Sequence, residues 1–157
     1  MDETDCKALL YLMANGRATW SDLAGYLGLS APAAADRVQK LEERGVITGY
    51  AALVDASAVD LGLTAFVAVT LDRSEHRQGF LKSVNGLAEV QECHHVTGDD
   101  DYLLKVRCRD TAHLDRLITD HLKGSPGVAR TRTTIALSTA KEGHELSIHP
   151  NGIRQSR

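Results

Sequence analysis

The sequence predicts an α+β protein that consists of an N-terminal helix-turn-helix and a C-terminal ferredoxin-like domain with the order βαββαβ. Two observations predict this division. Apolar residues recur at helical spacing through the first fifty residues, and this period is lost after Gly45. From Thr64 onward, two strand–helix–strand units follow one another. The expected parts are residues 1–50 (helix-turn-helix domain), 51–62 (linker strand and hinge), 63–140 (ferredoxin-like domain) and 141–157 (C-terminal tail).

The three N-terminal helices are predicted from residues that start and stop helices. A side chain that caps helix N-termini precedes each apolar run, and a glycine follows it. The caps are Asp2 or Thr4, Thr19 and Ser30, and the stops are Gly16, Gly28 and Gly45. In the third helix, Ala34, Val38 and Leu41 share one face, which we expect to be buried.

The C-terminal domain is predicted from four strand-like runs and two helices. The strands are expected at residues 64–72, 88–97, 101–108 and 128–139, and Ser74 and Asp110 cap the helices between them. This order gives one antiparallel sheet with both helices on one face. Valine, leucine and alanine fall on both sides of the first and third strands, so the uncovered face should be apolar. Such a face usually meets a partner. We therefore expect a homodimer packed sheet to sheet, with residues 50–54 pairing near its two-fold axis.

Composition limits the classes of protein that fit. The formal net charge of −3 excludes a strongly basic nucleic-acid binder, but it allows a binder with a few well-placed cations. No apolar run approaches the roughly 20 residues that a membrane helix needs, and the N-terminus is acidic, unlike a signal peptide. Cys6, Cys93 and Cys108 are too widely spaced for a disulfide framework or a metal cluster. We therefore expect a protein of the reducing cytoplasm.

The third helix is the candidate DNA-binding element, because the second helix of a helix-turn-helix enters the major groove. Residues outside its buried face, with polar residues at helix starts that can donate to phosphate, make up the candidate set. This set is Trp20, Ser21, Ser30, Ala31, Ala33, Asp36, Arg37, Lys40 and Arg44. Arg37 and Lys40 are the expected phosphate or guanine contacts. Asp36 and the pair Glu42-Glu43 count against DNA, so the spacing alone leaves open an ordinary three-helix bundle.

No catalytic or metal-binding constellation stands out in the sequence. Asp99, Asp100 and Asp101 lack the ligand spacing of a calcium loop, and an aspartate-rich turn needs no metal. His94 and His95 are neighbours on a predicted strand and therefore point to opposite faces. There is no phosphate-binding loop and no nucleophile–base pair at usable spacing. We expect no enzyme, no metal and no cofactor. The alternative to a DNA-binding regulator is a metabolite-binding interaction module that does not bind DNA.

The motifs in both halves of the chain resemble the Lrp/AsnC (leucine-responsive and asparagine-responsive) family of transcription regulators. Those of the N-terminal half are Asn15-Gly16-Arg17, Leu23-Ala24, Leu27-Gly28-Leu29-Ser30, Arg37-Val38, Leu41-Glu42, Gly45-Val46-Ile47 and Gly49-Tyr50. Those of the C-terminal half are Val96-Thr97-Gly98-Asp99, Asp101-Tyr102-Leu103-Leu104, Gly127-Val128, Thr131 and Thr133. The resemblance implies a winged helix-turn-helix that binds double-stranded operator DNA and a ferredoxin-like effector domain. It also implies an amino acid or related metabolite as effector, and a homodimer that often assembles further, up to an octamer.

The resemblance also implies an effector site at the turn after the second strand, near the dimer interface. Gly98 lets backbone N–H groups approach an α-carboxylate, and Asp101 can accept hydrogen bonds from an α-ammonium group. The candidate set is Gly98, Asp99, Asp100, Asp101, Tyr102, Thr133 and Thr134, the two threonines as hydroxyl partners. Asp100 departs from the family, in which a tyrosine or another bulky residue is common there. The extra carboxylate favours an effector with a cationic side chain, such as lysine or arginine. The alternative is that Asp100 faces water and the effector is aliphatic or absent.

Overall fold

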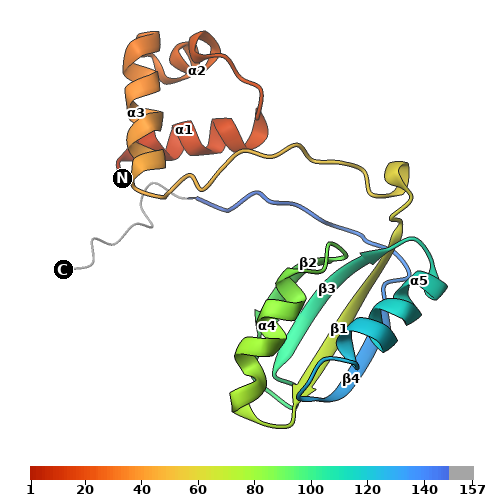
Figure 1. The fold of residues 1–157 in the computed structure, drawn as a ribbon. Helices are drawn as coiled ribbons and strands as arrows, with labels where there is room; N and C mark the ends of the chain where they lie inside the picture. The colour runs from red at the N-terminus through yellow and green to blue at the C-terminus, as the bar shows by residue number, and fades with distance from the viewer. Residues whose placement is uncertain (149–157) are drawn as a thin grey trace. The chain divides into compact units, whose positions relative to one another are not determined.

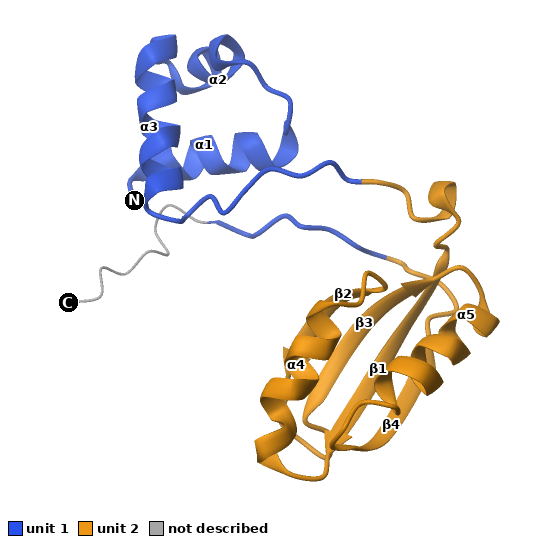
Figure 2. Ribbon diagram, viewed as in Figure 1, with its two compact units in different colours: residues 1–53, 141–157 blue, residues 54–140 orange. Residues whose placement is uncertain are grey.

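The computed structural model describes residues 1–148. The chain divides into two compact units, the first of residues 1–53 and 141–157 and the second of residues 54–140 (Figure 2). The boundary between residues 53 and 54 falls inside the expected linker. Residues 141–148 contain no helix or strand, as expected for a tail, and the rest of that predicted tail lies outside the described residues. Among the described residues, none of the helices is both long and apolar enough to cross a membrane.

Residues 51–62 form no strand within the single chain, and the pairing of residues 50–54 with a second copy stays a prediction. Within residues 51–62 the regular structure consists of one 3₁₀ turn, Ser57–Val59, which Asp55 supports by accepting a hydrogen bond from the Ser57 N–H at 2.9 Å. A strand requires a partner for its backbone N–H and C=O groups. The single chain supplies no such partner to this segment, so the extended sequence pattern does not become a strand here.

The first unit contains three helices, α1 (Glu3–Ala14), α2 (Trp20–Leu27) and α3 (Ala31–Glu43) (Figure 1). Asp2 rather than Thr4 caps α1, and Thr19 caps α2, each in a reciprocal capping box with the acid three residues later. Ser30 caps α3 as predicted. The buried residues Ala8, Leu23, Ala24, Ala34 and Val38 form the core between the helices. Leu41 is also buried, which confirms the predicted inner face of α3.

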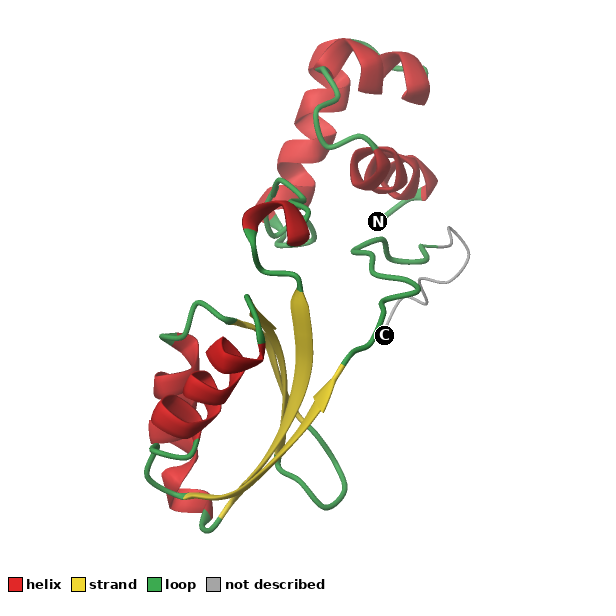
Figure 3. Ribbon diagram, turned by 90° about the vertical axis from the view of Figure 1, so that its right-hand side faces the viewer, coloured by secondary structure: helices red, strands yellow, loops and turns green. Residues whose placement is uncertain are grey.

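The second unit is a four-stranded antiparallel sheet whose open face is bare of helices (Figure 3). Its elements are β1 (Leu63–Leu71), α4 (Arg77–Asn85), β2 (Val90–His95), β3 (Tyr102–Cys108), α5 (Thr111–Arg116) and β4 (Val128–Ile135). A π-helical turn, Leu117–Leu122, prolongs α5. The strand order β2-β3-β1-β4, with both helices on one face, confirms the predicted ferredoxin-like arrangement. The last strand ends at Ile135 instead of residue 139, because its partner β1 begins at Leu63.

The core of this unit lies between the sheet and the two helices. Alternate strand residues reach it, with Val67 and Val69 from β1 and Leu104 and Val106 from β3. The helical segments cover these strand residues with the side chains of Phe80, Val84, Leu114, Leu117 and Leu122. Each such large side chain stabilises the fold by about 1.5–3 kcal/mol when it is fully buried. The two helices therefore hold the sheet in place and leave its other face open.

That open face is less apolar than the sequence predicts. The register places Phe66, Ala68 and Leu103 together at its centre. Charged and polar side chains from all four strands surround them, among them Glu92, His94, Lys105, Arg107, Arg130, Arg132 and Thr134. The expectation of an apolar face came from β1 and β3 alone. It is wrong for the rim, because the edge strands β2 and β4 add charges and β3 itself carries Lys105 and Arg107 on this face, while β1 turns its valines toward the helices.

Candidate DNA interface and effector turn

One side of α3 carries a stripe of exposed side chains opposite the core. Ala33, Asp36, Lys40 and Arg44 are exposed along it, and Ala31 is half-buried. Lys40 pairs with Asp36 at 2.7 Å, and the two side chains are 65% and 62% exposed. An ion pair so open to water contributes little, so Lys40 is free to turn toward a phosphate. Arg44 makes no ion pair within the described part of the chain.

Arg37 lies beside this stripe, but its side chain is bound by two acidic residues of the same unit. Its Nη1 donates to Asp2 Oδ2 at 2.7 Å and to Asp5 Oδ1 at 2.5 Å, both at the start of α1. The hydrogen bond from Arg37 lowers the pKa of the Asp2 carboxyl, and the two acids raise the pKa of Arg37. The guanidinium that the sequence assigns to DNA therefore already has two partners.

An open hollow of about 310 Å³ lies next to Arg37 in the same unit. It is lined by Asp5, Leu29, Ala33, Asp36, Arg37, Lys40, Leu41 and Arg44. Most of these residues belong to α3 or to the turn before it, and Asp5 belongs to α1. Side chains from α1 and α3 thus meet here across a space that they do not fill.

The predicted phosphate donors at the helix starts are at the surface. Trp20 is the first residue of α2 and is 49% exposed, and Ser21 follows it in an exposed position. The Ser30 hydroxyl accepts a hydrogen bond from the Ala33 N–H at 3.4 Å, so its own proton can be donated outward. The geometry of these residues is compatible with phosphate contacts beside the exposed stripe of α3.

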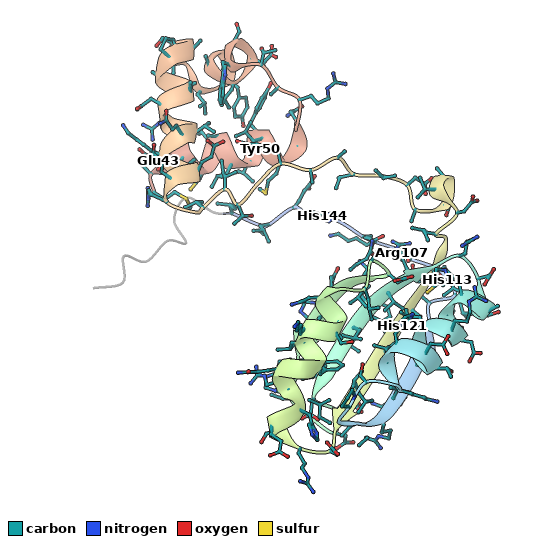
Figure 4. The ribbon with its side chains drawn as sticks, viewed as in Figure 1. Glu43, Tyr50, Arg107, His113, His121 and His144 are labelled. Atoms are coloured by element: carbon teal, nitrogen blue, oxygen red, sulfur yellow. The ribbon has the colours of Figure 1, made fainter. Side chains whose placement is uncertain are left out.

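The acidic pair at the end of α3 has partners of its own. Glu42 accepts a hydrogen bond from the Tyr50 hydroxyl at 2.8 Å, and Glu43 accepts one from Gln39 at 2.8 Å. Glu43 and Tyr50 are labelled in Figure 4. Partial desolvation, with the hydrogen bond to Glu42, raises the pKa of Tyr50 to about 12, although 58% of the residue is exposed. The hydrogen bond from Tyr50 to Glu42 therefore connects the segment after α3 to that helix, a contact that the local sequence pattern does not predict.

In the second unit, Asp100 is a buried charge with three partners. Its side chain is 8% exposed and accepts hydrogen bonds from the Thr70 hydroxyl at 3.0 Å, Arg132 Nη2 at 2.6 Å and Arg130 Nη2 at 3.3 Å. The alternative that Asp100 faces water is therefore wrong. The expectation of a cationic effector also loses its premise, because two arginines already neutralise this carboxylate.

The other predicted effector residues do not converge on one point. Asp101 accepts the Leu71 N–H at 2.7 Å, which fixes the turn against the end of β1. Tyr102 faces the helices and is 2% exposed, and the centroids of its ring and the Phe80 ring are 5.0 Å apart. Its hydroxyl has no hydrogen-bond partner among the described residues. Thr133 and Thr134 pair with Val67 and Phe66 and therefore point to opposite faces of the sheet. They cannot act as a pair of hydroxyls in one site.

The residues that do reach the turn from β4 are Arg130 and Arg132. Arg130 Nη2 also donates to the Asp99 carbonyl at 3.3 Å, while Gly98 and Asp99 are exposed. Neither arginine is among the residues that the sequence assigns to the effector, although their spacing of two residues puts them on one face of a strand, opposite in charge to Asp100. No group of three or more potential metal-ligating side chains occurs among residues 1–148.

Comparison with known proteins connects both units to one family. The family model of the AsnC-type helix-turn-helix domain matches residues 1–42, and that of the Lrp/AsnC ligand binding domain matches residues 64–146. A leucine-responsive regulatory protein of Haemophilus influenzae is 39% identical over 148 residues, which cover 93% of this chain and 89% of that protein. These matches confirm the resemblance stated from the sequence motifs.

Two solved structures show the same fold. A transcriptional regulator of Neisseria meningitidis in complex with L-Met has a TM-score of 0.89 and 33% identity, covering 93% of this chain and 96% of that one. A feast or famine regulatory protein of M. tuberculosis, complexed with L-methionine, has a TM-score of 0.86 and 36% identity, covering 92% of this chain and 97% of that one. The likeness extends over both units of the chain described above.

Proposed function

Because the chain belongs to the Lrp/AsnC family of DNA-binding transcription regulators, we propose that it reads operator DNA with α3, as a homodimer, under the control of an amino acid. The exposed stripe on α3 carries this proposal. Small residues at its start let the helix approach the groove, and Lys40 and Arg44 follow at the spacing of one helix face. Trp20, Ser21 and Ser30 would donate to phosphates beside it.

The dimer is proposed to form through the open face of the sheet. Phe66 is 38% exposed at the centre of that face, beside Ala68 and Leu103, and a charged rim surrounds the three side chains. An apolar centre with a polar rim is the usual anatomy of a protein interface. A two-fold dimer would present two copies of α3 to a pseudo-palindromic site.

The effector is proposed to bind at the turn between β2 and β3. Gly98 has a φ of +119°, which a residue with a side chain rarely adopts, and its exposed backbone suits a carboxylate. One carboxylate oxygen of Asp101 accepts the Leu71 N–H, and the other can accept a hydrogen bond from an ammonium group. The two neighbours solved with methionine support an amino acid of this kind. With Asp100 neutralised, the effector needs no cationic side chain.

The DNA-binding surface is tested by the double variant Lys40→Gln with Arg44→Gln. If both cations contact phosphate, the affinity falls, and the slope of log K against log salt becomes shallower by about 1.8. Fluorescence anisotropy with a labelled duplex from upstream of the protein's own coding sequence measures both quantities. The control is Lys82→Gln with Lys123→Gln, which makes the same change of net charge at exposed positions of the second unit. An equal loss in both double variants would refute the assignment to α3.

A further inference from the structure

The start of α1 and the middle of α3 share one guanidinium. Asp5 N–H donates to Asp2 Oδ1, and Asp2 N–H donates to Asp5 Oδ2, both at 2.8 Å, which forms the capping box. The remaining oxygen of each carboxylate accepts from Arg37 Nη1. All four carboxylate oxygens are therefore used in one network, and Arg37 is its link to α3.

This network differs in kind from the Lys40 pair on the same helix. The side chains of Asp5 and Arg37 are 11% and 30% exposed, against 62% and 65% for Asp36 and Lys40. Should Arg37 turn outward to a phosphate, Asp5 would stay behind as a mostly buried carboxylate without its cation. Leaving a buried charge unpaired costs far more than opening an exposed pair. Arg37 is thus poorly suited to be a DNA contact.

The packing around the network indicates what it does instead. The open hollow of about 310 Å³ lies beside Arg37 and Asp5, and apolar packing does not close it. The ion pairs of Arg37 therefore act together with buried apolar side chains, among them Cys6 and Leu41, in fixing the relative position of α1 and α3 at this end. The exposed cations Lys40 and Arg44 line the same hollow, so a change in the tilt of α3 would move both of them.

We propose that Arg37 is a positioning residue: clamped by Asp2 and Asp5, it sets the orientation in which α3 meets DNA, and it does not itself contact DNA. The inference rests on DNA binding by the protein and goes beyond it. It assigns a function to the two N-terminal acids, which by charge alone oppose DNA binding. Phosphate contacts on α3 are then left to Lys40 and Arg44.

The variant Asp5→Asn tests this proposal through the sign of its effect. If Arg37 contacts DNA and the acids compete for it, removing an acid frees a cation and tightens binding. If Arg37 positions α3, the same change loosens the clamp and weakens binding, on the order of tenfold, despite the more favourable charge. Arg37→Gln should cause a similar loss. The double variant should bind DNA with about the affinity of the single variant that binds less tightly, because both changes break the same network.

Anisotropy titrations over a range of salt concentrations, with the duplex described above and a random-sequence duplex, supply a second readout. Arg37→Gln and Asp5→Asn should leave the slope of log K against log salt unchanged, whereas Lys40→Gln should make it shallower by about 0.9. The matched control is Glu3→Gln in the same turn of α1, since Glu3 pairs with Lys7 and does not touch Arg37. It should bind DNA at least as well as the wild type.

Tighter or unchanged binding by Asp5→Asn, or a shallower slope for Arg37→Gln, would overturn the proposal. Circular dichroism establishes that each variant is folded. If Asp5→Asn is not, Asp2→Asn takes its place, because Asp2 is 56% exposed and its loss should weaken binding in the same direction. A wild-type protein that binds neither duplex would instead refute DNA binding itself.

Discussion

Replacing Asp100 with alanine is expected to lower the free energy of unfolding by about 2 kcal/mol. The carboxylate is buried and accepts hydrogen bonds from Thr70, Arg130 and Arg132. Its loss leaves two guanidinium groups close together without their shared anion. This expected loss of free energy is smaller than the loss from breaking a fully buried ion pair, because the arginine side chains are 57% and 66% exposed. Urea denaturation at neutral pH measures the change.

The neighbouring variant Asp99→Ala is the control for Asp100→Ala. Asp99 is exposed, and its side chain makes no ion pair within residues 1–148, so its loss should change the free energy of unfolding by about 0.5 kcal/mol or less. Asp100→Asn should lie between the two, because an amide can still accept the Thr70 hydrogen bond but carries no charge. Equal stability of Asp100→Ala and Asp99→Ala would show that the cluster contributes nothing.

Replacing Phe66 with glutamate is expected to weaken the homodimer by about a hundredfold or more. In the proposed dimer this side chain lies at the centre of the interface, and a buried unpaired carboxylate there costs several kcal/mol. The single chain should still fold, because Phe66 is 38% exposed in it. Sedimentation equilibrium at several protein concentrations measures the dissociation constant.

Ala112→Glu provides the matching control, since it places the same charge at an exposed position of α5, on the helical side of the sheet. It should leave the dissociation constant unchanged. A Phe66→Glu variant that remains dimeric at the same concentrations as the wild type would show that the open face is not the dimer interface.

Local sequence patterns predict the regular elements well, except that Ser74 lies in the 3₁₀ turn before α4 and does not cap that helix. Helix caps and stops identify α2 and α3, and period-two spacing puts Tyr102, Leu104 and Val106 on one face of β3, which the structure shows to be the buried face. These features depend on residues within one or two turns of one another, so the sequence contains what determines them. The expected linker strand differs, because a strand depends on a partner that the local sequence does not specify.

Charge pairing is the part that the sequence could not predict. Arg37 and its acids are 35 and 32 residues apart, and Asp100 is 30 and 32 residues from its two arginines. Which of several cations an acid meets is decided by tertiary packing. The helix-face spacing therefore assigns Arg37 to DNA, and the family resemblance places Asp100 in the effector turn, whereas the structure gives both of them partners inside their own units. The threonine pair is a different case, because alternation along β4 already separates Thr133 from Thr134.

Control of DNA binding by an amino acid is tested by the affinity of the wild-type protein for a duplex from upstream of its own coding sequence. This affinity is measured in the presence of each of the twenty amino acids in turn. A random-sequence duplex serves as the reference. We expect salt-dependent binding that favours the upstream duplex, and at least one amino acid that changes the affinity by about 5- to 150-fold. Equal affinity for both duplexes, or an affinity that no amino acid changes, would contradict it.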